Sequence, residues 1–464
     1  MSESSLPAPL AYDRAATTVG VVHFGPGAFF RAHQAAYFDD LLVTDPRWAI
    51  CAAALKSSGV RDALASQDGL YTLVELGETT RLRTIGAIVE LLVAAEDRER
   101  LAARLAHPDT RLVSLTVTEK GYCLGADGAL DAAHPDILQD LATPSRPVSV
   151  IGWLVEGLAR RRAAGLPPFV TLSCDNLPAN GRKLRDAVVT LAAARDPALA
   201  DWIAAQARFP CSMVDSITPA TDDALRARVL AETGLEDAWP IQRETFTQWV
   251  IEDDLGPDAP DLASVGVSLT DDVEAWERAK LRLLNGAHST LAYVGLMRGH
   301  ETVSQAMADP ALAAFVRAMM TQDIAPTLAA PAGLDVPAYI DALLARFRNP
   351  AIAHRLSQIA WDGSQKLPIR IGATLADALA AGRSVARLAV PLAAWMRFVI
   401  RQTRAGEALV DPLSADLAVL GEPAADSPDD VPAFLALERV FPPALAADLR
   451  VETALRDAWS GLPG

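Results

Sequence analysis

The chain has 464 residues and is acidic, with 58 Asp and Glu residues against 42 Lys and Arg residues and a formal net charge of −16. This length accommodates two or three domains, and a hydrophobic fraction of 51% indicates a globular chain with a large core. The charge argues against nucleic acid or an anionic membrane surface as a partner, so an anionic ligand would need a local pocket. Charged residues or proline interrupt the apolar runs before they reach the roughly 18 residues of a membrane span.

The cysteine pattern indicates a reducing compartment. The four cysteines lie at positions 51, 123, 174 and 211, and no two of them form a CxxC pair. The first ten residues lack the basic and apolar regions of a signal peptide. We therefore expect a cytoplasmic protein.

The first part of the chain alternates strand-like and helix-like segments. Short apolar runs at 19–24, 48–55, 111–118 and 168–173 predict strands, and a helical pattern at 31–42 follows the first of them. Short apolar strands separated by helices predict an α/β domain with a mostly parallel sheet that is covered on both faces.

A glycine turn follows the first predicted strand. Such a turn, leading into a helix, is where the pyrophosphate of a dinucleotide rests on the helix N-terminus. The third glycine of GxGxxG is replaced by Phe30, and a tight turn without a ligand is the alternative interpretation. The candidate cofactor-binding residues are Gly25, Gly27, Phe29, Phe30 and Arg31.

The end of the second predicted strand lacks the acidic residue that would bind a ribose 2′-hydroxyl. Lys56, Ser57, Ser58 and Arg61 stand there instead. Two cations and two hydroxyls could accept the 2′-phosphate of NADP, or they could be solvated loop residues.

Helical periodicity dominates the second part of the chain, at 275–298, 310–320, 336–347, 367–381 and 388–403. The segment 264–273 predicts a last strand followed by a helix cap. We therefore place a dinucleotide-binding domain at 1–271 and an all-helical substrate domain at 272–464.

The segment 280–288 (KLRLLNGAH) places Lys280, Asn285 and His288 on one broad face of a predicted helix. At roughly 100° per residue, Asn285 lies about 140° and His288 about 80° around the helix from Lys280. Leucines share this face, so we expect partial burial, which would lower the pKa of Lys280 and suit it to general acid/base catalysis. A simple ion pair between Lys280 and Glu277 is the alternative.

Five segments together resemble the mannitol dehydrogenase family, the polyol-specific long-chain dehydrogenases. They are VVHFGPGAFFRAHQAAYFDDLL at 21–42, SLTVTEKGYC at 114–123, SCDNLPANG at 173–181, FPCSMVDSITP at 209–219 and KLRLLNGAHS at 280–289. The resemblance spans nearly the whole chain. It implies a Rossmann-type N-terminal domain, a helical C-terminal domain, NAD or NADP as cofactor, no metal, and interconversion of a secondary alcohol and a ketone on a linear sugar.

The resemblance also implies catalytic roles. Lys280 matches the general acid/base, and Asn176 and Asn285 match the amides that hydrogen-bond the reacting oxygen. His288 matches a substrate-positioning residue. Glu119 matches an acid that could pass protons to solvent, with a strand-end acid as the alternative.

Two further residues match substrate contacts of the family. Asp215 could instead be a structural acid paired with a basic neighbour, and Lys366 a surface lysine on a helix. Ser216 stands where the family motif has an arginine, which could change how Asp215 is held.

A few positions bear on the substrate. Mannitol dehydrogenases usually have glycine at Lys120 and arginine at Gln358, whereas the fructuronate reductases (D-mannonate oxidoreductases) resemble this chain at TEKGYC, KLRLLNGAHS and QIAWDGSQKLP. Lys120 could bind a substrate carboxylate, with Arg282 as a weaker candidate. We therefore expect D-mannonate and D-fructuronate as substrate pair, with NAD before NADP as coenzyme.

Other functions stay open. The segments GLYTLVELG at 69–77 and EDAWP at 236–240 look more like mannitol 2-dehydrogenases, which act on mannitol and fructose, and arabinitol or tagaturonate are further candidates. A dinucleotide-binding protein without catalysis would tolerate loss of Lys280 or Asn176, and both are present. A hydroxyacyl or phosphogluconate-type dehydrogenase would not explain SCDN together with NGAHS.

Overall fold

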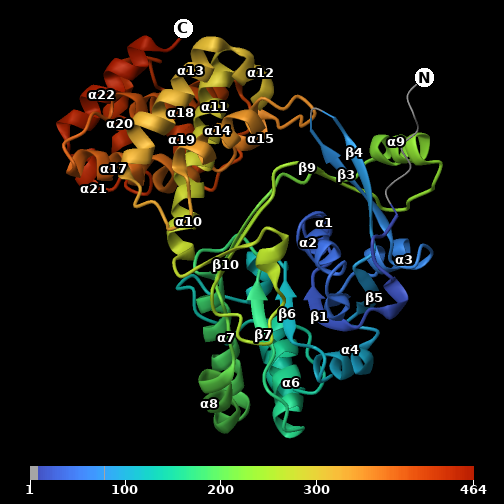
Figure 1. The fold of residues 1–464 in the computed structure, drawn as a ribbon. Helices are drawn as coiled ribbons and strands as arrows, with labels where there is room; N and C mark the ends of the chain where they lie inside the picture. The colour runs from blue at the N-terminus through green and yellow to red at the C-terminus, as the bar shows by residue number, and fades with distance from the viewer. Residues whose placement is uncertain (1–8, 78, 464) are drawn as a thin grey trace. The chain divides into compact units, whose positions relative to one another are not determined.

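The computed structural model describes residues 9–77 and 79–463 (Figure 1). It contains two compact units, of which the first ends at Glu274 and the second begins at Ala275. No helix in the described ranges is both long and apolar enough to cross a membrane.

An all-parallel five-stranded sheet with the strand order β5-β2-β1-β6-β7 forms the centre of the N-terminal unit (Figure 1). Its strands are β1 (Val19–Phe24), β2 (Ala49–Ala54), β5 (Ile88–Val93), β6 (Leu112–Leu115) and β7 (Val170–Ser173). This order is that of the Rossmann fold, with β1 at the point where the direction of winding reverses. The predicted α/β fold with a mostly parallel sheet is confirmed.

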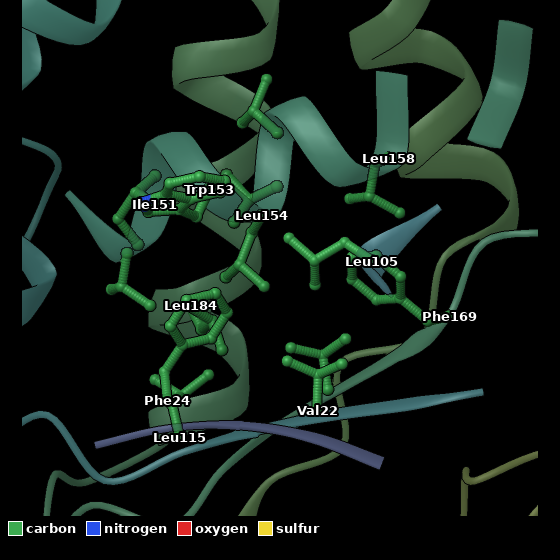
Figure 2. Packing of buried hydrophobic residues seen from close by; sticks show 14 of the residues in the cluster. Val22, Phe24, Leu105, Leu115, Ile151, Trp153, Leu154, Leu158, Phe169 and Leu184 are labelled. Atoms are coloured by element: carbon green, nitrogen blue, oxygen red, sulfur yellow. The ribbon is translucent and has the colours of Figure 1, made fainter. Parts of the chain in front are cut away.

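Alternate side chains of β1 enter two separate cores. Val22 and Phe24 pack under helices α4 (Arg98–Leu105), α6 (Val150–Ala163) and α7 (Asn180–Arg195). Figure 2 shows leucines of these helices directed towards Val22 and Phe24. Val21 faces the opposite side, under α1 (Ala28–Ala32) and α2 (Gln34–Leu41). A sheet buried on both faces explains why its strands read as continuous apolar runs.

The helix expected at 31–42 is in fact two helices, α1 and α2, which meet at His33. The backbone of His33 leaves the helical region, with φ −115° and ψ −87°. Its ring stacks on Phe29 at 5.0 Å and its Nε2 lies 3.1 Å from the carbonyl oxygen of Gln248. Periodicity could not predict this break, because it depends on a contact with a residue more than 200 positions away.

Two three-stranded sheets complete the N-terminal unit, in the orders β11-β10-β8 and β4-β3-β9. In them β8 pairs with β10 and β3 with β4 in antiparallel fashion. Their strands are β3 (Tyr71–Leu76), β4 (Arg81–Ile85), β8 (Ser212–Asp215), β9 (Ile241–Glu244), β10 (Gln248–Glu252) and β11 (Ser268–Thr270). The remaining α-helices are α3 (Gly59–Ala65), α5 (Pro135–Ala142), α8 (Pro197–Gln206) and α9 (Asp223–Thr233).

The C-terminal unit has no strand among its described residues, so its predicted helical character is confirmed. Its core is built on α11, which packs against α18 and α15. The α-helices from α10 onward are α10 (Val273–Ala279), α11 (Gly286–Met297), α12 (Val303–Ala308), α13 (Pro310–Ala318), α14 (Val336–Phe347), α15 (Leu356–Ile359), α16 (Gly363–Leu367), α17 (Ala373–Ala380), α18 (Ala386–Ala405), α19 (Ser414–Gly421), α20 (Val431–Leu435), α21 (Pro443–Ala446) and α22 (Leu449–Gly461).

Three π-helical segments interrupt these helices in the described part of the unit: η5 (Lys280–Asn285), η6 (Met319–Ile324) and η8 (Pro368–Gly372). Both η6 and η8 pack against η5. A π-helical turn closes i→i+5 hydrogen bonds and is therefore wider than an α-turn. The helix expected at 275–298 is present from Val273 to Met297, but its middle part is π-helical, so the angles derived for a regular α-helix were wrong.

Candidate active site

The glycine turn lies at the carboxyl end of β1, beside the end of β6. Gly25 has φ +92°, and a Cβ added to it would collide with the carbonyl oxygen of Thr116. The Thr116 hydroxyl donates to the carbonyl oxygen of Gly25 at 2.8 Å. Gly27 is exposed, and a Cβ there would meet nothing closer than 3.9 Å. The turn is thus tied down at Gly25 and open at Gly27, which suits the approach of a pyrophosphate to the backbone of α1.

His23 and Phe30 form the floor of this turn. Their rings stack at 3.5 Å with an interplanar angle of 7°, and both are fully buried. His23 Nδ1 lies 2.8 Å from the Ser114 hydroxyl, and its Nε2 lies 3.0 Å from the Thr116 hydroxyl. Burial lowers the pKa of His23 to about 3, so the ring is neutral at neutral pH. Phe30, which replaces the third glycine, is therefore a packing residue.

Arg31 braces the turn from inside the core. Its side chain is fully buried, donates to the carbonyl oxygen of Trp239 at 2.9 Å and lies over the rings of Tyr71 and Trp239. Burial lowers the pKa of this guanidinium to about 10. Phe29 is half-buried at the start of α1. Any contact of Arg31 with a cofactor would involve its backbone, because its side chain is enclosed.

The cations after β2 already have acidic partners. Lys56 lies 3.4 Å from Asp136, and Arg61 lies 2.6 Å from Glu96 and 2.9 Å from Asp62. These carboxylates offset the positive charges of Lys56 and Arg61, which the 2′-phosphate of NADP would need.

Glu119, Lys120 and Asn176 lie at the same edge of the sheet as the glycine turn, because they follow β6 and β7. Glu119 and Lys120 are exposed, on a 3₁₀ turn that begins after Thr118, whose φ is +65°. Asp175 holds this loop by accepting from the backbone N–H of Thr118 at 2.9 Å. It also accepts from the backbone of Val117 at 3.0 Å and from the hydroxyl of Tyr122 at 2.8 Å. Burial raises the pKa of Asp175.

Asp215 is the last residue of β8 and is 5% exposed. The start of β8 is anchored to Asn180, the first residue of α7, which donates to the carbonyl oxygen of Ser212 at 2.8 Å and accepts from its N–H at 2.9 Å. The hydroxyl of Ser216 donates to the carbonyl oxygen of Phe246 at 3.1 Å. The serine that replaces the family arginine therefore bonds to backbone and bears no charge.

In the C-terminal unit, Lys280 and Asn285 are the first and last residues of η5, and His288 lies in the first turn of α11. Lys280 is 9% exposed and Asn285 is half-buried. Arg282, on the same segment, lies 2.6 Å from Asp377 and 3.3 Å from the hydroxyl of Thr327. Arg282 is thus engaged in a structural ion pair.

His288 lies among aromatic and basic side chains. Its ring is 8% exposed and lies 4.7 Å from Phe347 and 5.2 Å from His354. Its Nε2 is buried and has no hydrogen-bond partner in the described ranges. Burial first, then His354, Arg346 and Arg370, hold the pKa of His288 well below its usual value. The imidazole is therefore neutral.

Lys366 lies on α16, which continues into η8, the π-helical segment in contact with η5. Its Nζ donates to the carbonyl oxygen of Trp361 at 2.6 Å and lies 3.7 Å from Asp362. Burial and then Arg370 lower the pKa of Lys366. Gln358 is exposed on α15.

Known proteins resemble the chain over nearly its whole length. The family described as the mannitol dehydrogenase Rossmann domain matches residues 19–263, and the mannitol dehydrogenase C-terminal domain matches residues 272–462. The D-mannonate oxidoreductase of Escherichia coli (strain K12) is 42% identical, covering 95% of this chain and 92% of the relative. A mannitol 2-dehydrogenase of Cereibacter sphaeroides is 40% identical, covering 97% and 95%. The chain belongs to the mannitol dehydrogenase family. The ternary complex of Pseudomonas fluorescens mannitol 2-dehydrogenase with NAD and D-mannitol is similar in structure, with a TM-score of 0.79 at 40% identity over 97% of this chain and 93% of that one.

Membership of the mannitol dehydrogenase family makes the protein an oxidoreductase that acts on CH–OH groups. Each unit brings together part of the predicted site: the glycine turn with Glu119, Lys120 and Asn176 in the first, and Lys280 with its neighbours in the second. The catalytic and substrate-binding roles of these residues stay predictions.

Three residues that support this family site had no functional assignment from sequence. His23 lies under the glycine turn, Asp175 holds the loop of Glu119, and Arg370 lies near His288. Asp175 could have been noticed, because it precedes Asn176 directly at the end of a predicted strand. No local signal marks His23 or Arg370.

Proposed function

We propose that the protein interconverts D-fructuronate and D-mannonate with NAD as coenzyme. The observation that supports this proposal is the set of basic side chains around His288. After burial, the groups that oppose the protonation of His288 are His354, Arg346 and Arg370, and Lys366 is close to Arg370. A protein with a net charge of −16 that gathers cations at this position is suited to a substrate carboxylate.

The coenzyme is NAD, held at the turn of Gly25 and Gly27. Lys56 and Arg61 are paired with acidic side chains, which disfavours the additional 2′-phosphate of NADP. When bound, NAD accepts the hydride from the alcohol carbon.

Side chains of this protein would transfer the proton and hydrogen-bond the reacting oxygen. Lys280 takes the hydroxyl proton in oxidation and returns it in reduction, and Glu119 passes protons to solvent. The amides of Asn285 and Asn176 donate to the reacting oxygen as charge develops on it. Neutral His288 bonds a substrate hydroxyl through Nε2.

Further substrate contacts belong to the proposal. Asp215 and Lys366 bind hydroxyl groups of the sugar chain, while Lys120 and Gln358 distinguish this chain from mannitol dehydrogenases. We assign cofactor binding to residues 1–271 and substrate binding to residues 272–464. The four buried, unpaired cysteines support a reducing, cytoplasmic setting.

Mannitol 2-dehydrogenase is the second candidate function. Relatives of that name are as similar to this chain as the mannonate enzyme, at 40% against 42% identity. The segments 69–77 and 236–240 also resemble that group.

A substrate panel tests the proposal. Initial rates are measured with fructuronate, tagaturonate, fructose and ribulose, each with NADH and with NADPH. We expect the highest kcat/KM for fructuronate with NADH. Preference for fructose would establish the second candidate instead, and absence of turnover with every ketose would support a protein that only binds the dinucleotide.

A further inference from the structure

Arg370 has no acidic partner among the described residues, in contrast to two other inward-facing arginines of the same unit. Arg397 lies 2.8 Å from Asp426, and Arg282 lies 2.6 Å from Asp377. Arg370 makes no ion pair in the part of the chain that the structure describes, and its Nε is buried there without a hydrogen-bond partner. A cation that has lost water and gained no anion costs free energy, so its retention suggests a ligand.

One nitrogen of the Arg370 guanidinium is held, and another has no partner among the described residues. Nη1 donates to the hydroxyl of Ser289 at 3.2 Å. Nε and Nη2 lie on the opposite edge, and this pair of donors matches the two oxygens of a carboxylate. Ser289 thus fixes the rotation of the guanidinium plane without neutralising it.

Arg370 lies near two other groups that can carry a positive charge, Lys366 and His288. Arg370 lowers the pKa of both Lys366 and His288, after the effect of burial in each case. Burial likewise lowers the pKa of Arg370 itself. Lys366 already donates to the carbonyl oxygen of Trp361, whereas the Nε of Arg370 has no partner among the described residues.

Arg370 also lies beside the proposed catalytic segment. It belongs to η8, which packs against η5, the segment from Lys280 to Asn285. Gly286 permits this approach, because a Cβ added to it would lie only 3.2 Å from the carbonyl oxygen of Arg370. An anion at Arg370 would therefore lie within the same unit as Lys280, Asn285 and His288.

We propose that Arg370 binds the carboxylate of the substrate through Nε and Nη2, with Ser289 as the residue that positions its guanidinium. This inference rests on the proposed function, because only a uronate or aldonate supplies the carboxylate. Neutral ketoses would leave this edge of Arg370 unused.

Steady-state kinetics of Arg370→Gln and Arg370→Lys test the inference, with Arg383→Gln as a control for an exposed arginine. KM and kcat are measured for fructuronate and fructose with NADH, and Ki is measured for D-mannonate and for D-mannitol against fructose reduction. We expect Arg370→Gln to raise the fructuronate KM and the mannonate Ki by about tenfold or more, with little effect on the fructose KM or the mannitol Ki. Arg370→Lys keeps the positive charge but loses the paired N–H donors of the guanidinium. Its fructuronate KM and mannonate Ki should therefore lie between those of the wild-type protein and Arg370→Gln.

Equal changes for charged and neutral ligands, or no change, would overturn the role of Arg370. If the wild-type protein reduces fructose but not fructuronate, the proposed function fails, whereas the mannonate Ki still decides the role of Arg370. Thermal melting of each variant separates loss of folding from loss of carboxylate binding. If Arg370→Gln does not fold, the KM and Ki values of Arg370→Lys test the role of Arg370 instead.

Discussion

Lys280 begins a wide π-helical turn and is almost fully buried, in a protein that has only five lysines. Lys280→Ala should lower kcat by about 100-fold or more, because a positioned general acid/base contributes a factor of that order. The dissociation constant for NADH, measured by fluorescence titration, should change little. Lys183→Ala, on α7, is the matched control, and near-normal turnover of Lys280→Ala would refute the assignment.

The two glycines of the turn should respond differently to the same substitution. Gly25→Ala forces a side chain into the left-handed region and against Thr116, so we expect a loss of several kcal/mol of stability or no soluble protein. Gly27→Ala meets only the carbonyl oxygen of Gly25, at 3.9 Å, and should fold normally but weaken NADH binding. Unfolding in urea and NADH titration measure the two effects. An unchanged NADH affinity in Gly27→Ala would argue against a cofactor at this turn.

His23 should make the N-terminal unit sensitive to acid. Its pKa is about 3 in the folded protein against 6.5 for the free group, so below about pH 6.5 the unfolded chain binds a proton that the folded chain does not. The contribution of neutral His23 to the free energy of unfolding is therefore complete above this pH. It decreases as the pH falls, by about 2 kcal/mol at pH 5. Burial also lowers the pKa of His288 in the C-terminal unit, so acidification should reduce the stability of that unit as well.

Urea unfolding at pH 7 and pH 5 measures this effect. His23→Gln should be less stable at pH 7 because it disturbs the bonds to Ser114 and Thr116, but it should lose less on acidification. His107→Gln removes an exposed histidine and serves as control. The same acid dependence in wild type and His23→Gln would contradict the prediction.

At the scale of elements, the close packing of α16 on α11 and α18 depends on a glycine. A Cβ added to Gly363 would collide with Tyr293 and with Trp395. Gly363→Ala should therefore destabilise the protein by about 1–3 kcal/mol, as overpacking usually does. Gly461→Ala, in α22 with nothing within 4 Å, should be neutral or stabilising. Equal thermal midpoints for the two variants would show that α16 shifts freely.

Elements with a strong local signal were predicted well. The strand at 19–24 and the helix at 336–347 match β1 and α14 residue for residue, because continuous burial and a regular amphipathic face leave a clear pattern. The strands β3, β4, β5, β8, β9 and β10 were not predicted. They are short and several are only partly buried. Two of the pairings, β3 with β9 and β8 with β10, join segments distant in sequence.

The π-helical turns could not be predicted from periodicity. At η8 the chain offers one local cause, since Pro368 lacks the N–H that would continue the α-helical ladder. At η5 no residue from Lys280 to Asn285 breaks a helix by itself, and the segment packs against η6 and η8. Tertiary packing therefore decides the geometry of the segment that carries Lys280 and Asn285.

At the scale of the whole molecule, the thiols should be protected by folding. All four cysteines are unpaired and buried, and burial raises the pKa of each. A thiol-specific reagent should modify less than one thiol per native chain within minutes and four in guanidinium chloride. Rapid modification of the native protein would show that at least one of these cores opens readily.

The sequence by itself determined the fold class and the family, and it supplied most of the candidate site residues, whose roles stay predictions. Hydrophobic periodicity and glycine turns are local features, and five ordered motifs identify a family. Only the tertiary structure decided that Arg282 is neutralised by Asp377, that His23 supports the turn and that Arg370 has a buried Nε without a partner among the described residues. The reason is physical, because the charge state and availability of a side chain depend on neighbours brought in from distant parts of the chain.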